Sequence, residues 1–173
     1  SEMCIRDRAM DSYDLWSGCQ LIREYLDILT NWYVRRSRRR FWDGTATTHE
    51  SFDVFYTCFE AFIRAASPLM PFVAEEIFRG LTGEESVHLA DYPDAALFPE
   101  DPDLVERMDA TRGVCSVGSS LRKAQRLRVR LPLSTLTVAT DIELGEDFTS
   151  IIADELNVKS VDVLRMNEAA EAG

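Results

Sequence analysis

The chain has 173 residues, of which 46% are hydrophobic and 28% are charged, enough apolar material for the core of one domain or slightly more. Its longest apolar runs are short and interrupted by charges, which excludes a transmembrane segment. The formal net charge of -11 opposes binding to nucleic acid if it is averaged over the whole surface.

The positive charges are nevertheless concentrated in two short windows. Ten of the nineteen Lys and Arg residues lie in them, and neither window contains an acidic residue. Acidic residues dominate residues 75–110 and 141–173 instead. Segregated charge of this kind allows a protein that repels phosphate on average to bind it locally. The two windows are Arg35, Arg36, Arg38, Arg39 and Arg40, and Arg122, Lys123, Arg126, Arg128 and Arg130.

Residues 1–9 do not resemble the start of a domain. The first eight, SEMCIRDR, have no helical stripe and none of the features of a signal peptide. We interpret residues 1–9 as a non-native or disordered leader, with the first eight derived from a translated cloning or assembly scar. A helical domain is expected to follow at residues 10–126.

The first predicted helix begins between Asp14 and Trp16 and ends at Trp42, before Asp43-Gly44. At about 100° per residue, its apolar stripe continues through Arg36 and Arg40, for which we predict structural roles with buried acids or helix-end carbonyls. The opposite side is either a solvated basic surface or a polyanion site, and the pattern leaves both open. That side carries Trp32, Arg35, Arg38 and Arg39.

A second helix is predicted to open at the capping box Thr47-x-x-Glu50. Its aromatic residues have helical spacing, which is more typical of a packed core than of a base-stacking platform. The stripe comprises Phe52, Phe55, Tyr56, Phe59, Phe62, Ile63 and Ala66.

A third helix follows Pro71, which suits the first helical position, and ends at Thr82-Gly83. Its Glu75 and Glu76 point about 100° apart and therefore do not share a catalytic or metal site. We assign them structural roles, compensating the helix dipole and forming a salt bridge within the bundle. His88, in the loop beyond, is expected to be a packed, hydrogen-bonding residue rather than a catalyst.

The remaining sequence changes from helical to alternating periodicity. A fourth helix is predicted from Pro102 to Arg126, with Leu104, Met108, Cys115 and Leu121 on its stripe and with glycines 113 and 118 marking close packing. Strands are expected at residues 126–133, 136–139 and 160–164, and a short helix at residues 148–156. Residues 127–173 would then form a small α+β unit that we expect to be incomplete, after a mainly α bundle.

The sequence contains no nucleophile elbow, phosphate-binding glycine loop or Ser/His/Asp grouping. Two His residues and four dispersed Cys residues make a zinc site improbable. We therefore predict no catalytic residue, metal site or cofactor in this chain, and a role in binding.

Five blocks occur in an order that resembles the isoleucyl-tRNA synthetases, members of class Ia, over about residues 10–165. They are MDSYD at 10–14, LTNWYVRRSR at 29–38, PLMPF with EEIF at 68–78, SVHL with YP at 86–93, and LRKA with RVRLPL at 121–133. The third and fourth blocks would also suit valyl or leucyl enzymes, whereas NWYVRR selects the isoleucyl type. The resemblance implies a helical bundle of the anticodon-binding type.

The same resemblance implies that the parent protein is a cytoplasmic, ATP- and Mg²⁺-dependent isoleucine–tRNA ligase. The HIGH and KMSKS motifs of the family's catalytic domain do not occur here, so this piece is expected to be inactive alone. Its partners would be isoleucine-accepting tRNA and the parent's catalytic domain, with no DNA and no membrane. The alternative is a helical protein-interaction or scaffold domain whose Arg cluster docks on an acidic protein surface.

Under the tRNA hypothesis, arginine side chains of the first cluster contact phosphate, with an aromatic ring beside them as a stacking or packing surface. The second cluster would extend this track. The candidate tRNA-binding residues are Trp32, Arg35, Arg38, Arg39, Arg122, Lys123 and Arg126.

Overall fold

The computed structural model describes residues 14–44, 46–94, 96 and 98–167. The chain divides into two compact units, Ser1–Pro99 and Glu100–Gly173. The fold is mainly α-helical with a small α+β unit, as predicted. The expected leader at residues 1–9 lies outside the described residues, and the expected domain boundary at residue 127 stays a prediction.

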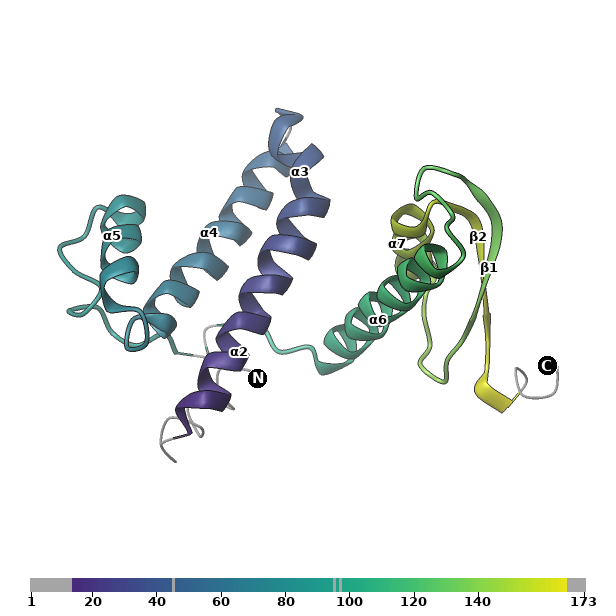
Figure 1. Ribbon diagram of the computed structural model, residues 1–173. Helices are drawn as coiled ribbons and strands as arrows, with labels where there is room; N and C mark the ends of the chain where they lie inside the picture. Colours follow the sequence, from purple (N-terminus) through teal and green to yellow (C-terminus); the bar gives the residue numbers. More distant parts are fainter. Residues whose placement is uncertain (1–13, 45, 95, 97, 168–173) are drawn as a thin grey trace. The chain divides into compact units, whose positions relative to one another are not determined.

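The first unit is built on a long helical rod made of α2 (Leu15–Asp27), η1 (Ile28–Val34) and α3 (Arg35–Trp42), visible as one continuous helix in Figure 1. Asp14 caps its start, because the carboxylate accepts a hydrogen bond from the backbone N–H of Ser17 at 3.1 Å. Hydrogen bonds from the side chain and from the backbone N–H of Ser17 lower the pKa of Asp14.

The middle segment of the rod, η1, is π-helical, whereas the sequence predicted an uninterrupted α-helix. A π-helix closes its hydrogen bonds from i to i+5, so each of its turns holds more residues than an α turn. The buried face of the rod therefore shifts along the chain. Past η1 it passes through Ser37, which is 0% exposed, and half-buried Phe41. The predicted continuation of this face through Arg36 and Arg40 is wrong for this reason.

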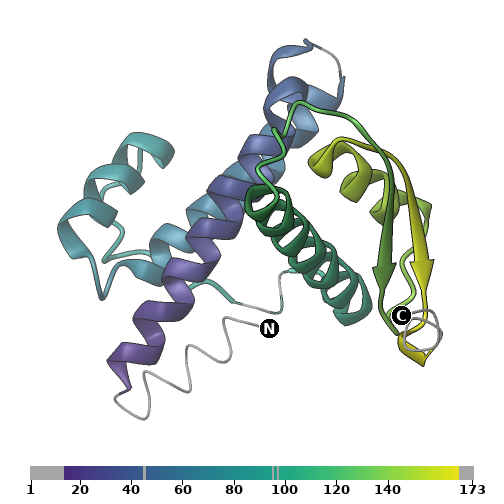
Figure 2. The same ribbon diagram turned by 45° about the vertical axis from the view of Figure 1, so that its right-hand side comes forward.

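Helix α4 (Ala46–Ala66) runs beside the rod in both views of Figures 1 and 2, and α5 (Pro71–Thr82) follows it. The predicted aromatic stripe of α4 is buried in its C-terminal half, whereas Phe52 and Tyr56 near its start are 50% and 43% exposed. Apolar burial is therefore densest where α4 and α5 meet. The core consists of Phe62, Ile63, Ala66, Ala74, Phe78 and Val87.

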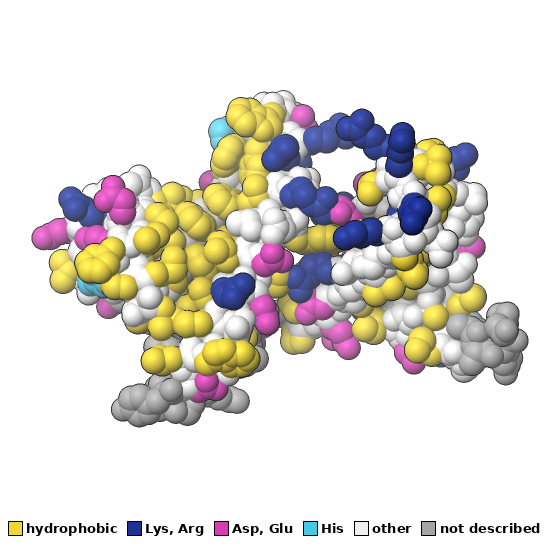
Figure 3. All heavy atoms as spheres, viewed as in Figure 1, with side chains coloured by type: hydrophobic (Ala, Val, Ile, Leu, Met, Phe, Trp, Pro, Cys, Tyr) yellow, Lys and Arg dark blue, Asp and Glu magenta, His cyan; other side chains and the backbone are white. Residues whose placement is uncertain are grey.

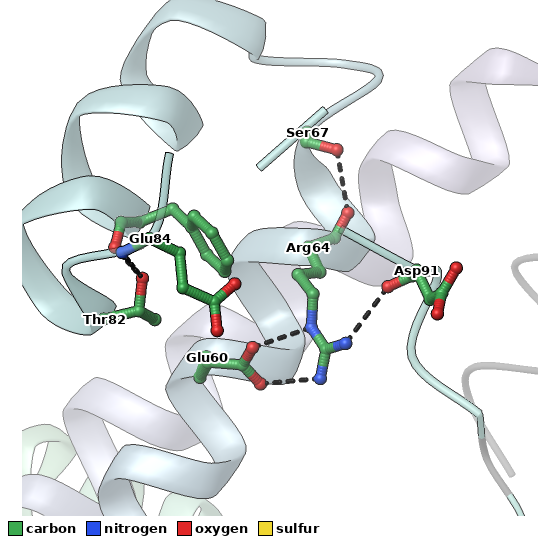
Figure 4. A network of polar contacts seen from close by, with 7 residues as sticks. Glu60, Arg64, Ser67, Thr82, Glu84 and Asp91 are labelled. Atoms are coloured by element: carbon green, nitrogen blue, oxygen red, sulfur yellow. Dashed lines mark hydrogen bonds and ion pairs between the residues drawn. The ribbon is translucent and has the colours of Figure 1, made fainter. Parts of the chain in front are cut away.

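Glu60 and Arg64 on α4 connect the helix to the loop after α5. Figure 4 shows the guanidinium of Arg64 in a bidentate ion pair with Glu60, at 2.7 and 2.9 Å. Its Nη1 also donates to the backbone carbonyl of Asp91 at 3.0 Å. Both ionised side chains are largely shielded from solvent, so this contact is stronger than a typical surface ion pair.

Glu75 fastens the turn that follows α5. Its carboxylate accepts hydrogen bonds from the Ser86 hydroxyl at 2.9 Å and from the Val87 backbone N–H at 3.0 Å. Val87 is 3% exposed, whereas His88 and Glu76 are exposed. The expected packing of the His88 ring is therefore wrong, because its apolar neighbour occupies the buried position.

The second unit combines α6 (Pro102–Ala124) with a β1-α7-β2 arrangement: β1 (Leu133–Ala139), α7 (Glu146–Leu156) and β2 (Val158–Leu164). The two strands are parallel, and α7 provides the crossover that parallel pairing requires. None of the described helices is long and apolar enough to cross a membrane.

The face of α6 that packs against α7 differs from the predicted stripe. Leu104 and Leu121 are 51% and 60% exposed, so assigning them to the core was wrong. Cys115 is buried as predicted, and the other buried positions are Thr111, Gly118 and Arg122. A methyl group at Gly118 would collide with the side chain of Leu156, which confirms the close packing expected there.

Residues 126–132 form turns and irregular backbone, whereas the sequence predicted a strand. Their alternation of apolar and basic residues is real, but Val129 and Leu131 are 63% and 48% exposed. The backbone carbonyls of Arg128, Val129 and Leu131 accept hydrogen bonds from the side chain of Arg122 instead of from another strand. The Arg122 side chain is thus hydrogen-bonded to carbonyls that would pair with a neighbouring strand in a sheet.

Candidate nucleic-acid interface

The first basic cluster covers the surface of α3. Arg35, Arg38 and Arg39 are exposed there, as predicted from helical phase, and Trp32 is half-buried at the preceding turn. Figure 3 shows Lys and Arg side chains gathered over this helix. No acidic residue lies between Asp27 and Asp43, so the positive potential of the surface is not locally cancelled.

Trp32 and Arg36 form a cation–π pair on the rod. The guanidinium carbon of Arg36 lies 5.4 Å from the centroid of the Trp32 ring. This is the geometry in which a cation is attracted by the electron-rich face of an indole. The contact pairs Arg36 with an aromatic ring of the rod, and the structural role expected for this arginine stays a prediction.

Arg35 and Asn31 mark the exit from the π-helical segment. The backbone N–H of Arg35 bonds to the carbonyl of Trp32, and its side-chain Nε donates to the carbonyl of Asn31 at 2.9 Å. This bond holds the Arg35 side chain close to the helix surface.

Arg40 contributes to the contact between α3 and α4. Its Nη2 donates to the hydroxyl of buried Ser37 at 2.9 Å, and its backbone carbonyl accepts from the Thr48 hydroxyl at 2.7 Å. Nearby, the Tyr33 hydroxyl donates to the carbonyl of Ser51 at 3.1 Å. Burial raises the pKa of Tyr33, so the phenol remains a neutral donor. These contacts support the structural role predicted for Arg40, with a hydroxyl as its partner.

The second basic cluster divides into one buried residue and several exposed ones. Arg122 is 5% exposed, and its guanidinium donates to four backbone carbonyls. A group enclosed in this way is not presented at the surface, so the geometry favours a structural role over the phosphate contact that we predicted. The exposed members are Lys123, Arg126, Arg128 and Arg130.

Arg126 ends α6 in a left-handed conformation, with φ of 55°. The backbone N–H of Leu127 bonds to the carbonyl of Arg122 at 2.8 Å, and that of Arg126 to the carbonyl of Lys123 at 3.1 Å. This pair of bonds is a Schellman motif, which usually has glycine at the left-handed position. An arginine here retains a positive charge at a sterically unfavourable position.

The sequence did not reveal the Trp32–Arg36 pair or the role of Arg122. The first has the i, i+4 spacing that makes two residues neighbours on a helix, and this spacing was the signal that could have found it. The second depends on the approach of α7, which is distant in sequence. Arg128 and Arg130 were not among the predicted site residues, although both lie in the second basic window.

Neither cluster has the composition of a catalytic centre. Within the described part of the chain, no group of three or more His, Cys, Asp or Glu residues is arranged to hold a metal ion. Guanidinium and ammonium groups beside an aromatic ring instead provide binding to phosphate and stacking on bases. The arrangement therefore offers recognition of a polyanion.

Comparison with known proteins agrees with a nucleic-acid interface. The family model described as "Anticodon-binding domain of tRNA ligase" matches residues 6–137. An isoleucine–tRNA ligase of Corynebacterium efficiens is 55% identical over 156 residues, and those of Nocardia farcinica and Mycobacterium tuberculosis are 51% and 50% identical. Each alignment covers 90% of this chain and 15% of the relative. The chain spans about 15% of the length of these relatives, and it belongs to the family of anticodon-binding domains of tRNA ligases.

Proposed function

We propose that this chain is the part of an isoleucine–tRNA ligase that grips the anticodon arm of isoleucine-accepting tRNA. The family match and the names of the similar ligases support this assignment. The exposed α3 surface carries this proposal. It presents Arg35, Arg38 and Arg39 to solvent, next to the turn that holds Trp32.

The α3 surface would act by positioning rather than by chemistry. A ligase must hold a long RNA so that its 3′ end reaches a distant catalytic site. Phosphate contacts fix the position of the RNA, whereas unstacked loop bases are read by stacking and edge hydrogen bonds. Arg35, Arg38 and Arg39 would contact phosphate, and the Trp32–Arg36 pair would offer a flat surface to a base.

The remaining partners follow from the ligase assignment. ATP and Mg²⁺ would bind a catalytic domain outside this chain, because the HIGH and KMSKS motifs of that domain do not occur in this sequence. That domain would be the second partner of this chain, and the cytoplasm is the compartment that we propose. Isoleucine-dependent pyrophosphate exchange by the purified chain would contradict the proposal that catalysis belongs to another domain.

Titration of tRNA binding against salt tests the α3 surface. Three neutralised phosphates predict that log K falls with log salt at a slope of roughly -2 to -3. Replacing Arg35 and Arg39 with Glu should reduce both the affinity and the slope. The matched control is Arg23→Glu with Arg79→Glu, which makes the same charge change at exposed positions on α2 and α5.

Equal affinities of the two double variants for tRNA would overturn the proposal. So would binding that does not depend on salt. If acidic proteins are instead captured by the unmodified chain and lost only in the α3 variant, the Arg cluster is a protein-docking surface. A gel-shift with tRNA and a pull-down with acidic proteins separate these outcomes.

A further inference from the structure

We propose that residues 123–130, the end of α6 and the loop that follows it, form a second RNA phosphate-binding surface, and that Arg122 is the positioning residue that shapes this loop. This inference rests on the proposed binding of tRNA. In this proposal, exposed Arg128 and Arg130 contact RNA, whereas Arg122 orders the loop without contacting RNA itself.

The loop has a defined backbone path. The Schellman motif at Arg126 turns the chain away from the helix axis. A second turn follows, closed by a hydrogen bond from the backbone N–H of Leu131 to the carbonyl of Arg128 at 2.9 Å. The exposed basic side chains are therefore attached to an ordered backbone, which lowers the entropy lost when they bind a ligand.

Arg122 holds this path from the inside. Its Nη2 lies 2.6 Å from the carbonyl oxygens of both Arg128 and Leu131, and 3.3 Å from that of Val129. Its Nη1 reaches the carbonyl of Leu156 at the end of α7, at 3.1 Å. One buried guanidinium thus links two parts of the chain through its fork of donors, an arrangement that Lys cannot reproduce.

The inward direction of these carbonyls has an electrostatic consequence. Carbonyl oxygens carry partial negative charge, and three of those in the loop are directed to the buried cation rather than to solvent. The side chains of Arg126, Arg128 and Arg130 are exposed on the same segment. Residues 110–140 contain six Lys and Arg residues and no Asp or Glu, so nothing within this stretch neutralises the surface.

The chemistry of the loop matches phosphate better than it matches a protein surface. Arginine forks bind phosphate oxygens through two parallel hydrogen bonds. Residues 123–130 contain no aromatic residue and no Met, the residue types enriched in the cores of protein interfaces. Figure 3 shows the Lys and Arg side chains gathered in the region of the loop that follows α6.

The first experiment replaces Arg126, Arg128 and Arg130 with Gln in the full chain and measures tRNA affinity against salt. Loss of three phosphate contacts should make the log–log slope shallower by about 2 to 3. The control replaces Arg107, Lys159 and Arg165 with Gln, which removes the same charge from the second unit outside the loop. An unchanged slope in the loop variant, or an equal change in the control, would overturn the proposal.

The second experiment tests Arg122 with the Arg122→Lys substitution, which keeps the charge but removes the fork. We expect faster hydrogen exchange at residues 126–131 and a slope of log K against log salt that is shallower by about 1 to 2. Both are measured at a temperature where β1 and β2 remain protected from exchange, so that the second unit is still folded. A purely structural residue would change the exchange rates and leave the slope unaltered. Asn157→Gly is a milder variant, because it removes only the 3.2 Å amide hydrogen bond to the Val129 carbonyl and preserves the left-handed backbone.

The outcomes separate the two proposals. If the unmodified chain does not bind tRNA, both the proposed function and this loop assignment fail. If binding depends on the α3 arginines but not on the loop arginines, only the loop assignment fails. Salt-dependent binding of poly-glutamate by the loop, with RNA affinity unchanged in the loop variant, would replace RNA by an acidic protein as the partner.

Discussion

The two basic clusters look alike in sequence but differ in their physical organisation. In the first unit, the arginines lie along the surface of α3, and the side-chain contacts described for Arg35, Arg36 and Arg40 reach residues three or four positions away. In the second unit, Arg122 is buried and organises backbone from two other segments, while its basic neighbours are exposed. A charge window therefore predicts where cations gather, but not which of them support the fold.

The largest effect is expected from removing the buried guanidinium. Arg122→Met keeps much of the apolar stem but removes the donor that four carbonyls share, of which those of Arg128 and Val129 keep a second donor. The second unit should therefore lose about 3 kcal/mol in free energy of unfolding. Arg38→Met, in the exposed cluster, should change stability by less than about 0.5 kcal/mol. Urea unfolding of both variants measures the difference. Similar losses would remove the distinction between the clusters.

The rod in the first unit offers a test of the helical phase. Ser37 is 0% exposed because η1 has rotated it inward, so Ser37→Leu should destabilise the first unit by about 1–3 kcal/mol through overpacking. In an uninterrupted α-helix the buried face would pass through Arg36 instead. Thermal unfolding should therefore show a clear loss for Ser37→Leu and little change for Arg38→Leu. A Ser37→Leu variant as stable as Arg38→Leu would contradict the helical phase that η1 sets.

Two glycines on α6 provide a matched pair for the second unit. Gly118→Ala should cost about 1–3 kcal/mol, because the new methyl group collides with Leu156. Gly113→Ala meets no atom within 4 Å and should instead gain about 0.5–1 kcal/mol from helix propensity. Chemical denaturation of the two variants should give opposite signs. A gain at both positions would mean that α6 and α7 are not closely packed.

The smallest effect concerns the left-handed end of α6. Arg126→Gly should raise the stability of the second unit by about 1 kcal/mol, since glycine adopts a φ of 55° without a steric penalty. Arg126→Ala removes the same charge but keeps the strain. Both variants should lose tRNA affinity equally, and only the glycine variant should melt at a higher temperature. Unequal affinities would show that the backbone, and not the guanidinium, contributes to binding.

The sequence alone determined the class of the molecule. Regular apolar spacing along α4 and the Pro and Gly signals around α5 fix local structure through short-range sterics, and both helices are found where they were predicted. The family was also recognisable, because the NWYVRR run and its accompanying blocks are local strings.

Only the tertiary structure decided the roles of single residues. The phase of α3 depends on the π-helical segment, whose extra residues per turn place Ser37, rather than Arg36, in the interior. The loop after α6 does not form the predicted strand, because the Arg122 side chain donates hydrogen bonds to its carbonyls. Hydrogen bonding and burial between distant segments leave no periodic signal, so the division of the basic residues into support and surface emerges only when the chain has folded.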